Sequence, residues 1–237
     1  MDRPPFPIHA IQNVRISEKN TLNLDLNITG PHKFTIFVAL FLYTMDIKGK
    51  KIILGSNSPR RKELLAGLDI DFTVDTGNTF EEVYSEDTPH EHIPEILAEG
   101  KSYGFHRPLE EDEILITSDT LVLCGDRVMG KPHSREEAVD MLRCLSGREH
   151  KVITAVTVRD CRTYSTCSDT AIVHFKELSD NEIKYYIDNF KPFDKAGAYG
   201  IQEWIGYIGI GKIEGSFFTI MGLPVHLVYQ KLIEFIG

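Results

Sequence analysis

The sequence predicts an α/β protein in which a mixed, twisted sheet is flanked by helices. From Lys51 onward, short apolar runs of the kind found in buried strands recur along the chain. Between these runs stand helix signals, in the form of N-cap residues and capping boxes. Strand and helix signals that interleave along one chain are typical of α/β folds, so this class is expected over the whole region.

The first half of this region begins with a short apolar strand and a capped helix. Ile52–Leu54 is the strand, Ser58 is the expected N-cap with Pro59 at the first helical position, and Arg60–Leu68 is the helix. Ile114–Ser118 is the next predicted strand. A hairpin is expected to follow it, with these parts in order: Leu121–Leu123, the turn Gly125–Asp126, and Val128–Met129.

The second half follows the same alternation. Ser134 and Glu137 form a capping-box pattern that opens a helix ending near Leu145, and Ser179 with Glu182 opens another that ends near Asn189. Two β-rich segments between these helices are expected to pair, and an amphipathic helix is expected at the end. These segments are Val152–Arg159, Thr170–Phe175 and Val225–Ile236.

Residues 1–44 differ from the rest in composition, with a proline-rich start at Met1–Pro7 and a polar middle. We expect them to be an N-terminal extension that arose as a gene-model artefact, with the true start at Met45 and one domain over residues 45–237. The alternative is a genuine N-terminal arm in which Thr35–Tyr43 adds an edge strand or docks against a partner.

Charge and composition exclude several classes of protein. The chain has 237 residues, of which 42% are hydrophobic and 26% are charged, as in ordinary globular proteins. Its formal net charge of -9 argues against stable nucleic-acid binding, which needs a basic face. It does not exclude an enzyme for a single nucleotide, because a few local cations and a metal can hold one triphosphate in an acidic protein.

Neither the cysteines nor the apolar run indicates secretion or a membrane. The four cysteines form no C-x-x-C pair and no zinc-ligand spacing, so we expect reduced thiols in a cytoplasmic protein. Phe34–Tyr43 has ten residues, whereas a spanning helix needs about 20. No small-residue cleavage site follows it, so a signal peptide is not expected either.

Gly55–Arg61 is the first candidate for a binding site. Free N–H groups and the positive end of a helix dipole gather between a buried strand and a helix start, which favours an anionic ligand. Two adjacent arginines, Arg60 and Arg61, add forked donors that match phosphate oxygens. The alternative is a capped helix whose arginines are simply solvated.

Further candidates lie on later segments. Thr117–Thr120 is expected to end a strand, which would put Asp119 where α/β sheets bind ligands, available to a divalent metal or to the proton of a water molecule. A turn aspartate is the alternative. Lys131 and Lys101 could reach a phosphate or could be solvated. In Asp194–Gln202, small residues allow close approach of a ligand, and the Gln202 amide could read a base edge.

Taken together, these segments resemble the Maf family of nucleotide pyrophosphatases, which is related to the inosine-triphosphatase-like fold. They occur in the family's order and cover about residues 50–237. The matching segments are Ser56–Arg61, Glu81–Glu82, Leu97–Lys101, Ser118–Thr120, Gly130–Pro132, Asp194–Gly197, Tyr199–Gln202, Glu214–Ser216 and Gly222–Pro224.

The resemblance implies a two-lobed protein, usually a homodimer, with a nucleotide cleft between its lobes. It implies cleavage of a nucleoside triphosphate to monophosphate and pyrophosphate with a divalent cation, Mg²⁺ or Mn²⁺. The combination of Lys195 with Tyr199–Gln202 resembles the dTTP/UTP subgroup, for which modified pyrimidine triphosphates are further candidate substrates. Rival interpretations are an inosine-triphosphate pyrophosphatase and a non-catalytic nucleotide-binding regulator of septum formation.

The resemblance also implies roles for single residues. Asp119 is the expected proton acceptor, and Arg60, Thr120 and Gln202 are the expected specificity positions. The expected phosphate and metal contacts are Ser56, Arg61, Glu82, Lys101, Lys131, Asp194 and Lys195, with the metal held by Glu82, Asp119 and Asp194.

The sequence departs from the family pattern at three places, and residues 1–44 have no counterpart in it. Ser118 replaces the commoner alanine, and Phe217–Phe218 stands where tyrosine is often found. Gly100 lies inside the helix that carries Lys101 and is expected to weaken it by roughly 1 kcal/mol relative to alanine.

Overall fold

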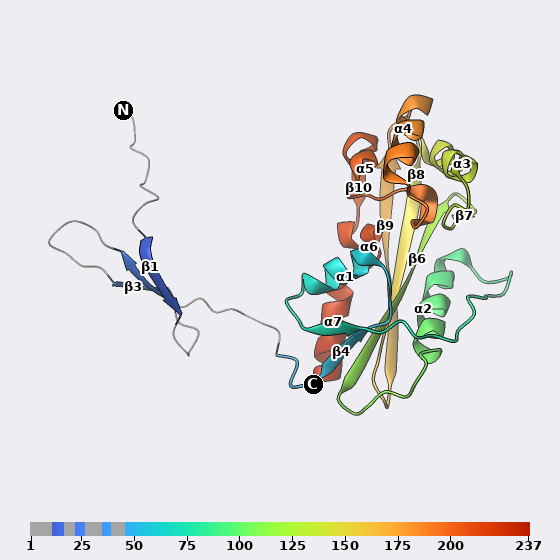
Figure 1. Ribbon diagram of the computed structural model, residues 1–237. Helices are drawn as coiled ribbons and strands as arrows, with labels where there is room; N and C mark the ends of the chain where they lie inside the picture. The colour runs from blue at the N-terminus through green and yellow to red at the C-terminus, as the bar shows by residue number, and fades with distance from the viewer. Residues whose placement is uncertain (1–10, 17–21, 27–34, 39–45) are drawn as a thin grey trace, which may run out of the picture. The chain divides into compact units, whose positions relative to one another are not determined.

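A computed structural model of the chain describes residues 11–16, 22–26, 35–38 and 46–237 (Figure 1). The chain divides into two compact units, Met1–Thr44 and Met45–Gly237. In the first unit, Ile11–Ile16 (β1), Leu22–Leu26 (β2) and Thr35–Val38 (β3) form an antiparallel sheet in that order. The expected strand over Thr35–Tyr43 therefore pairs with β2 as far as Val38, and residues 39–43 lie outside the described residues. That Met45 is the true start stays a prediction.

The second unit is built on a seven-stranded mixed sheet with the order β10-β9-β8-β6-β4-β5, and β7 pairs with β6. Strand β4 runs parallel to β5 and β6, whereas all other neighbours are antiparallel. The strands are Lys51–Leu54 (β4), Phe72–Val74 (β5), Glu113–Cys124 (β6), Arg127–Met129 (β7), Glu149–Arg159 (β8), Tyr164–Phe175 (β9) and Ile210–Glu214 (β10).

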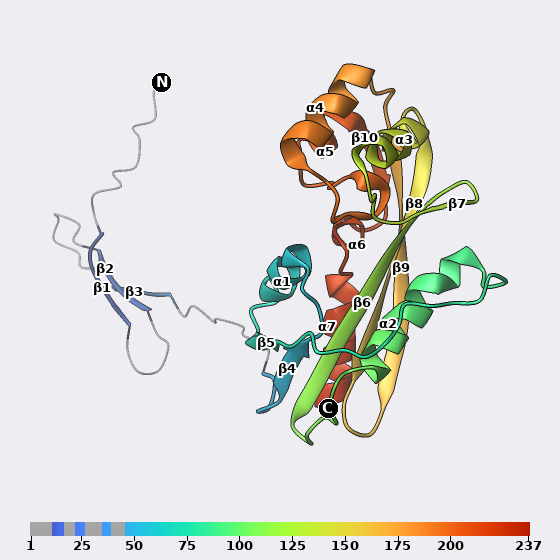
Figure 2. The same cartoon turned by 45° about the vertical axis from the view of Figure 1, so that its right-hand side comes forward.

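Helices surround this sheet in two groups, which make the two lobes. In Figures 1 and 2, α1, α2 and α7 lie along one half of the long strands β6, β8 and β9, and α3, α4 and α5 lie along the other half. The helices are Pro59–Ala66 (α1), His90–His92 (η2), Ile93–Tyr103 (α2), Arg135–Leu145 (α3), Asp180–Phe190 (α4), Ala196–Ala198 (η3), Trp204–Gly209 (α5), Phe217–Met221 (α6) and Val225–Ile236 (α7). None of the helices in the described part is long and apolar enough to cross a membrane.

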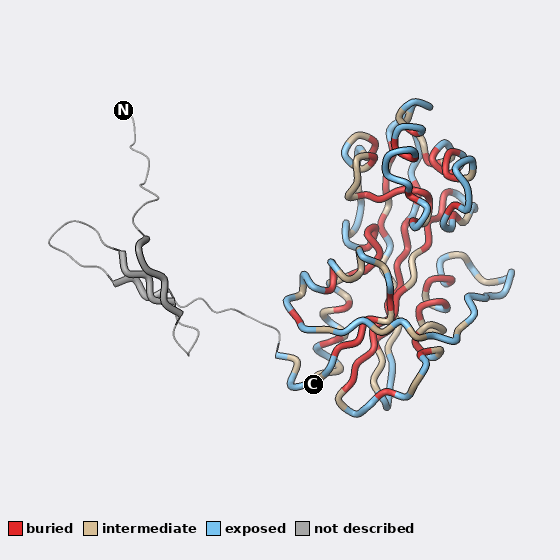
Figure 3. Tube along the Cα trace, viewed as in Figure 1, coloured by how far each residue is buried: buried red, intermediate tan, exposed pale blue. Residues whose placement is uncertain are grey.

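Apolar side chains cover both faces of the sheet, which explains why its strands read as continuous apolar runs. Because successive side chains point to opposite faces, β6 divides its residues between two cores. Ile114, Ile116 and Val122 belong to the large core, whereas Leu121 and Leu123 pack with α2. Figure 3 shows buried residues running along the central strands, with exposed residues on the outer turns of the helices.

The helix starts follow the predicted caps. The Ser58 side chain accepts the N–H of Arg61, with Pro59 in the first turn of α1, and Ser179 with Glu182 forms the complete capping box of α4. At α3 only half of the box is present. Ser134 accepts the N–H of Glu137, but the Glu137 carboxylate accepts from the N–H of His133 instead.

Strand β6 differs from the expectation in a way that matters for the site. The predicted strand ended at Ser118 and was followed by a separate hairpin strand, whereas β6 runs unbroken from Glu113 to Cys124. Its pairing with β4 stops at Ile116, but its pairing with β8 continues to Leu123. Asp119 therefore lies in the middle of a strand, beside the point at which the shorter β4 ends.

Candidate functional site

A cavity of about 870 Å³ lies where β4 ends and exposes the middle of β6. Its wall includes every residue that the sequence singled out for catalysis, substrate or metal. These are Ser56, Arg60, Arg61, Glu82, Lys101, Asp119, Thr120, Lys131, Asp194, Lys195 and Gln202. Segments far apart in the chain therefore meet at one place, although this proximity does not by itself test the role of any residue.

The pleat of β6 sorts the polar side chains at the centre of the cavity. Thr117 and Asp119 point to the α2 side, where the Thr117 hydroxyl donates to the carbonyl of Ala98. Ser118 and Thr120 point to the opposite side, toward α1 and the segment after α6. The Ser118 hydroxyl donates to the carbonyl of Gly222 at 3.3 Å, which gives the departure from alanine a structural role.

Lys101 joins two carboxylates on the α2 side. It lies four residues after the buried Leu97, so it faces the sheet as Leu97 does. Its ammonium is 2.5 Å from the carboxylate of Asp119 and 2.8 Å from that of Glu82. The hydrogen bond from Lys101 holds the pKa of Glu82 below its ordinary value, so this carboxylate is ionised at neutral pH.

Gly100 is explained by the loop that carries Glu82. A Cβ atom at Gly100 would lie 2.2 Å from the ring of Phe80, far inside van der Waals contact. The glycine thus costs helix propensity but lets Phe80 lie against α2, and Phe80 lines the cavity two residues before Glu82.

The guanidinium of Arg61 forms its hydrogen bonds with other groups of the protein. Its guanidinium donates to the carbonyl of Ser118 at 2.7 Å, the carbonyl of Gly222 at 2.9 Å and the hydroxyl of Thr120 at 3.1 Å. Burial lowers the pKa of Arg61, although an arginine stays charged at neutral pH. Arg61 therefore fixes the start of α1 to β6 and to the segment after α6.

Arg60 is placed differently from its neighbour. Its guanidinium meets the carboxylate of Asp194 at 2.8 Å, and Asp194 also accepts a hydrogen bond from Lys195 at 2.6 Å. Burial raises the pKa of Asp194, but these two cations outweigh burial and hold the pKa below its ordinary value. Asp194 is thus paired with the cations of Arg60 and Lys195. The described residues contain no group of three or more His, Cys, Asp or Glu side chains that could hold a metal ion.

Gln202 and Lys131 complete the wall. The Oε1 atom of Gln202 is buried and accepts no hydrogen bond from the described residues. Such an acceptor is costly unless a ligand satisfies it, so Gln202 fits a position that contacts a ligand. Lys131 is exposed and follows β7, directly after Gly130, whose carbonyl accepts the N–H of Gly197 at 3.0 Å.

Sequence reasoning missed two residues that support this wall through Lys195 without lining the cavity. Glu203 accepts from Lys195 at 3.0 Å, and Tyr186, on α4, donates its hydroxyl to Glu203. Glu203 directly follows Gln202, so proximity to the motif was an available signal. Tyr186 carried no such signal, because its apolar neighbours Ile183 and Ile187 make it look like an ordinary core residue.

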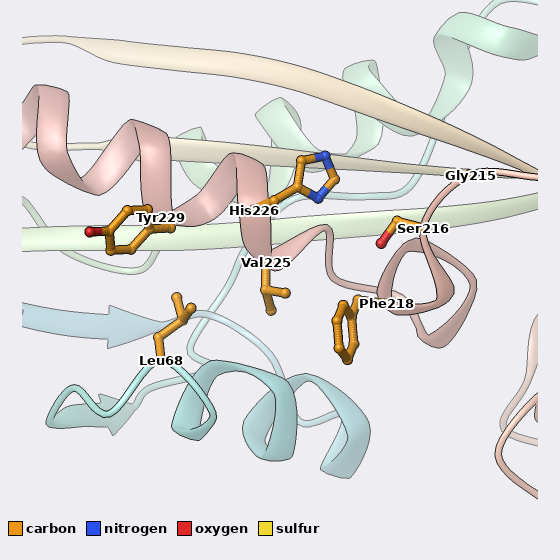
Figure 4. Close-up of a pocket in the computed structure, with 7 residues that line it drawn as sticks. All are labelled: Leu68, Gly215, Ser216, Phe218, Val225, His226 and Tyr229. Carbon is orange, nitrogen blue, oxygen red and sulfur yellow. The ribbon is translucent and has the colours of Figure 1, made fainter.

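A second hollow, of about 670 Å³, lies between the loop after α1 and helix α7 (Figure 4). Figure 4 shows Leu68 and Val225 pointing into it and Phe218 at one end. Its wall carries no lysine, arginine or carboxylate, in contrast to the first cavity. An apolar wall of this kind does not compensate the charge of a phosphorylated ligand, so the cavity at β6 is the candidate site.

This fold and this site define an α/β protein with a cavity between two lobes, where cations and carboxylates meet in an arrangement that suits an anionic ligand. Comparison with known proteins agrees, since residues 51–235 match the family model described as Maf-like protein. The chain belongs to the Maf family.

The match to this chain covers nearly the whole length of its curated relatives. A dTTP/UTP pyrophosphatase of Parabacteroides distasonis is 48% identical over 80% of this chain and 98% of its own. One of Phocaeicola vulgatus is 50% identical over 79% of this chain and 97% of its own. One of Porphyromonas gingivalis W83 is 47% identical over 80% and 96%. Among solved structures, a HAM1 protein from Coxiella burnetii has 13% identity and a TM-score of 0.33, covering 53% of this chain and 73% of that chain, which is too weak a likeness to carry an argument.

Proposed function

We propose that this chain hydrolyses dTTP and UTP to the nucleoside monophosphate and pyrophosphate. The observation that carries the proposal is the convergence of Arg60, Lys101, Lys131 and Lys195 on one cavity beside Asp119. The relatives that bear the name dTTP/UTP pyrophosphatase match almost end to end, which supports the same substrates. A homodimer in the cytoplasm is part of the same proposal.

The proposed reaction adds one water molecule to the phosphoanhydride bond between the α- and β-phosphates. The oxygen of water forms a bond to the α-phosphorus, the bond from the α-phosphorus to the bridging oxygen breaks, and pyrophosphate leaves. Asp119 receives the proton of the attacking water. Its carboxylate is held at one place by the Lys101 ammonium, 2.5 Å away, so it is oriented before substrate enters. Arg60, Lys131 and Lys195 compensate the charge of the triphosphate.

A divalent cation, Mg²⁺ or Mn²⁺, fits the donors on the α2 side of the cavity. Glu82 and Asp119 offer the carboxylate oxygens that such hard cations prefer, and the Lys101 ammonium between them marks a place where positive charge is stabilised. Glu82 and Asp119 are the residues that would hold the cation. Asp194 is the weaker candidate, because Arg60 and Lys195 already occupy its carboxylate. When bound, the cation supplies neutralisation of phosphate charge.

Asp119→Asn tests the role of the carboxylate. The substitution keeps the shape of the side chain but removes the proton acceptor, so pyrophosphate release from dTTP should fall at least 100-fold, as is typical when a general base is lost. Asp126→Asn, in the exposed turn after β6, is the matched control and should keep the wild-type rate. A folded Asp119→Asn protein with near-normal turnover would show that another group accepts the proton.

A further inference from the structure

Lys195 is unusually confined for a lysine at the wall of a cavity. Its side chain is only 9% exposed, and its ammonium lies 2.6 Å from Asp194 and 3.0 Å from Glu203. A lysine stem has several rotatable bonds, so its charged end contributes to recognition only if something holds it in place. The two carboxylates are the groups that hold it here.

The two carboxylates are not equivalent. The Asp194 side chain is 56% exposed and is shared with Arg60, itself a candidate for contact with the triphosphate. An incoming polyanion repels Asp194 and competes for both of its cations. The Glu203 side chain is 20% exposed, and its second oxygen accepts a hydrogen bond from the hydroxyl of Tyr186. Glu203 is therefore the partner of Lys195 that stays in place when substrate binds.

Tyr186 holds Glu203 in place from the side away from Lys195. It is fully buried on α4, and its hydroxyl accepts the N–H of Gly200 at 2.9 Å while it donates to Glu203. Burial, together with the neighbouring Glu203, raises the pKa of Tyr186, so the hydroxyl keeps its proton and remains a donor. A Cβ atom at Gly200 would lie 2.8 Å from the carboxyl carbon of Glu203 and 3.0 Å from Cε of Lys195, so the backbone closes tightly on the pair.

We propose that Glu203, oriented by the hydroxyl of Tyr186, is a positioning residue that fixes the Lys195 ammonium at the cavity wall for contact with the nucleotide. The inference rests on the proposed function, which makes a nucleoside triphosphate the ligand. Glu203 itself does not touch the substrate in this account. It acts through Lys195, and its main contribution is to substrate affinity.

Steady-state kinetics of Glu203→Gln with dTTP test the proposal. The amide keeps the size of the side chain but loses the charge that holds Lys195, so KM should rise about ten-fold with kcat changed less than about three-fold, as expected when ground-state and transition-state binding weaken together. Tyr186→Phe should raise KM about three-fold. Glu203→Asp keeps the charge and should fall between wild type and Glu203→Gln. Tyr185→Phe, on the exposed side of the same helix, is the control and should leave KM unchanged.

A double-mutant cycle separates positioning from a merely structural role. If Glu203 acts through Lys195, then Glu203→Gln should add less than about two-fold to the KM of Lys195→Gln. Fold-changes that multiply in the double variant, or a folded Glu203→Gln protein with the wild-type KM, would overturn the proposal.

Binding of the non-hydrolysable analogue α,β-imido-dUTP, measured by titration calorimetry, keeps this test separate from the test of activity. Binding weakened about ten-fold by Glu203→Gln supports the positioning role even if the wild-type protein releases no pyrophosphate, in which case the proposed activity alone fails. Equal affinity of the two proteins for the analogue would overturn the positioning role while leaving the activity untouched.

Discussion

Arg60 and Arg61 are adjacent in sequence but have different environments, and this difference predicts different effects on stability. Arg61→Met keeps most of the aliphatic stem and removes the guanidinium that donates to the Ser118 carbonyl, the Gly222 carbonyl and the Thr120 hydroxyl. Hydrogen bonds from a charged donor contribute about 1.5–3 kcal/mol each, so three of them amount to about 4.5–9 kcal/mol. The cost of burying the guanidinium offsets several kcal/mol of this sum.

The net loss expected for Arg61→Met is about 2–4 kcal/mol in the free energy of unfolding. For a domain of this size, that loss corresponds to a decrease in Tm of roughly 5–15 °C. Urea unfolding followed by circular dichroism gives the free energy of unfolding, and thermal unfolding gives Tm. The dependence of the free energy on urea concentration should be the same for wild type and Arg61→Met if both unfold from the same native state.

Arg60→Met is the matched control for this experiment. Arg60 pairs with Asp194, whose side chain is 56% exposed, and exposed ion pairs of this kind contribute ~0–1 kcal/mol. Arg60→Met should therefore weaken substrate binding without a measurable loss of stability. Arg61→Met should weaken substrate binding and also lower the free energy of unfolding. Equal destabilisation by the two variants, or an Arg61→Met protein as stable as the wild type, would refute the assignment of Arg61 as the residue that ties α1 to β6.

Further predictions concern Gly100, the α4 cap and the cation. Gly100→Ala should lower Tm despite the better helix propensity of alanine, because its Cβ would lie 2.2 Å from the Phe80 ring; adding Phe80→Leu should recover part of the loss, and a Tm raised by Gly100→Ala alone would contradict the contact. Hydrogen bonds from Lys176 and Ser179 lower the pKa of Glu182 from 4.5 to about 2. A lowered folded-state pKa stabilises the protein above pH 4.5, and this stabilisation is lost as the pH falls through about 2. Glu182→Gln should accordingly be less stable than wild type at pH 7 and equal to it near pH 2 in urea unfolding, whereas a difference that persists at pH 2 would point to another cause. Removal of divalent cations with EDTA should abolish pyrophosphate release, and added Mg²⁺ or Mn²⁺ should restore it; turnover that survives EDTA would contradict the role given to Glu82 and Asp119.

Local signals in the sequence identified much of the fold because their physical causes are local. A serine before Pro59 and the spacing of Ser179 and Glu182 satisfy helix N–H groups within one turn, and the structure confirms both caps. The expected pairing of Val152–Arg159 with Thr170–Phe175 is confirmed as part of the longer antiparallel pair β8–β9. The mixed α/β sheet with helices on both faces is likewise confirmed.

The length of β6 could not be predicted in the same way. Ser118, Asp119 and Thr120 are polar, so the segment resembles a strand end or a turn in sequence. What keeps it extended is pairing with β8, more than 30 residues later in the chain, which continues after β4 has ended. The polar residues are tolerated there because the cavity exposes Asp119 and because Arg61 and Gly222 satisfy Ser118 and Thr120.

The candidate site also combines features that local sequence signals predict with features that depend on contacts distant in sequence. Motif order was enough to predict which residues gather around one cavity, although Asp119 lies in mid-strand and Lys101 lies in the last turn of α2. The direction of each side chain depends on the pleat of the sheet and on partners distant in sequence. That is why the sequence could not show that Arg61 donates to the backbone of β6 while Arg60 pairs with Asp194, and gave no sign of Tyr186 behind Lys195.

Pyrophosphate release from a panel of triphosphates tests whether this chain hydrolyses dTTP and UTP. The panel comprises dTTP, UTP, 5-methyl-UTP, CTP, ITP and 7-methyl-GTP, each with Mg²⁺ or Mn²⁺ and with EDTA as the control. We expect cation-dependent release confined to the thymidine and uridine members, and loss of that release in Asp119→Asn. A folded protein that releases pyrophosphate from none of them, or only from ITP or 7-methyl-GTP, would contradict it.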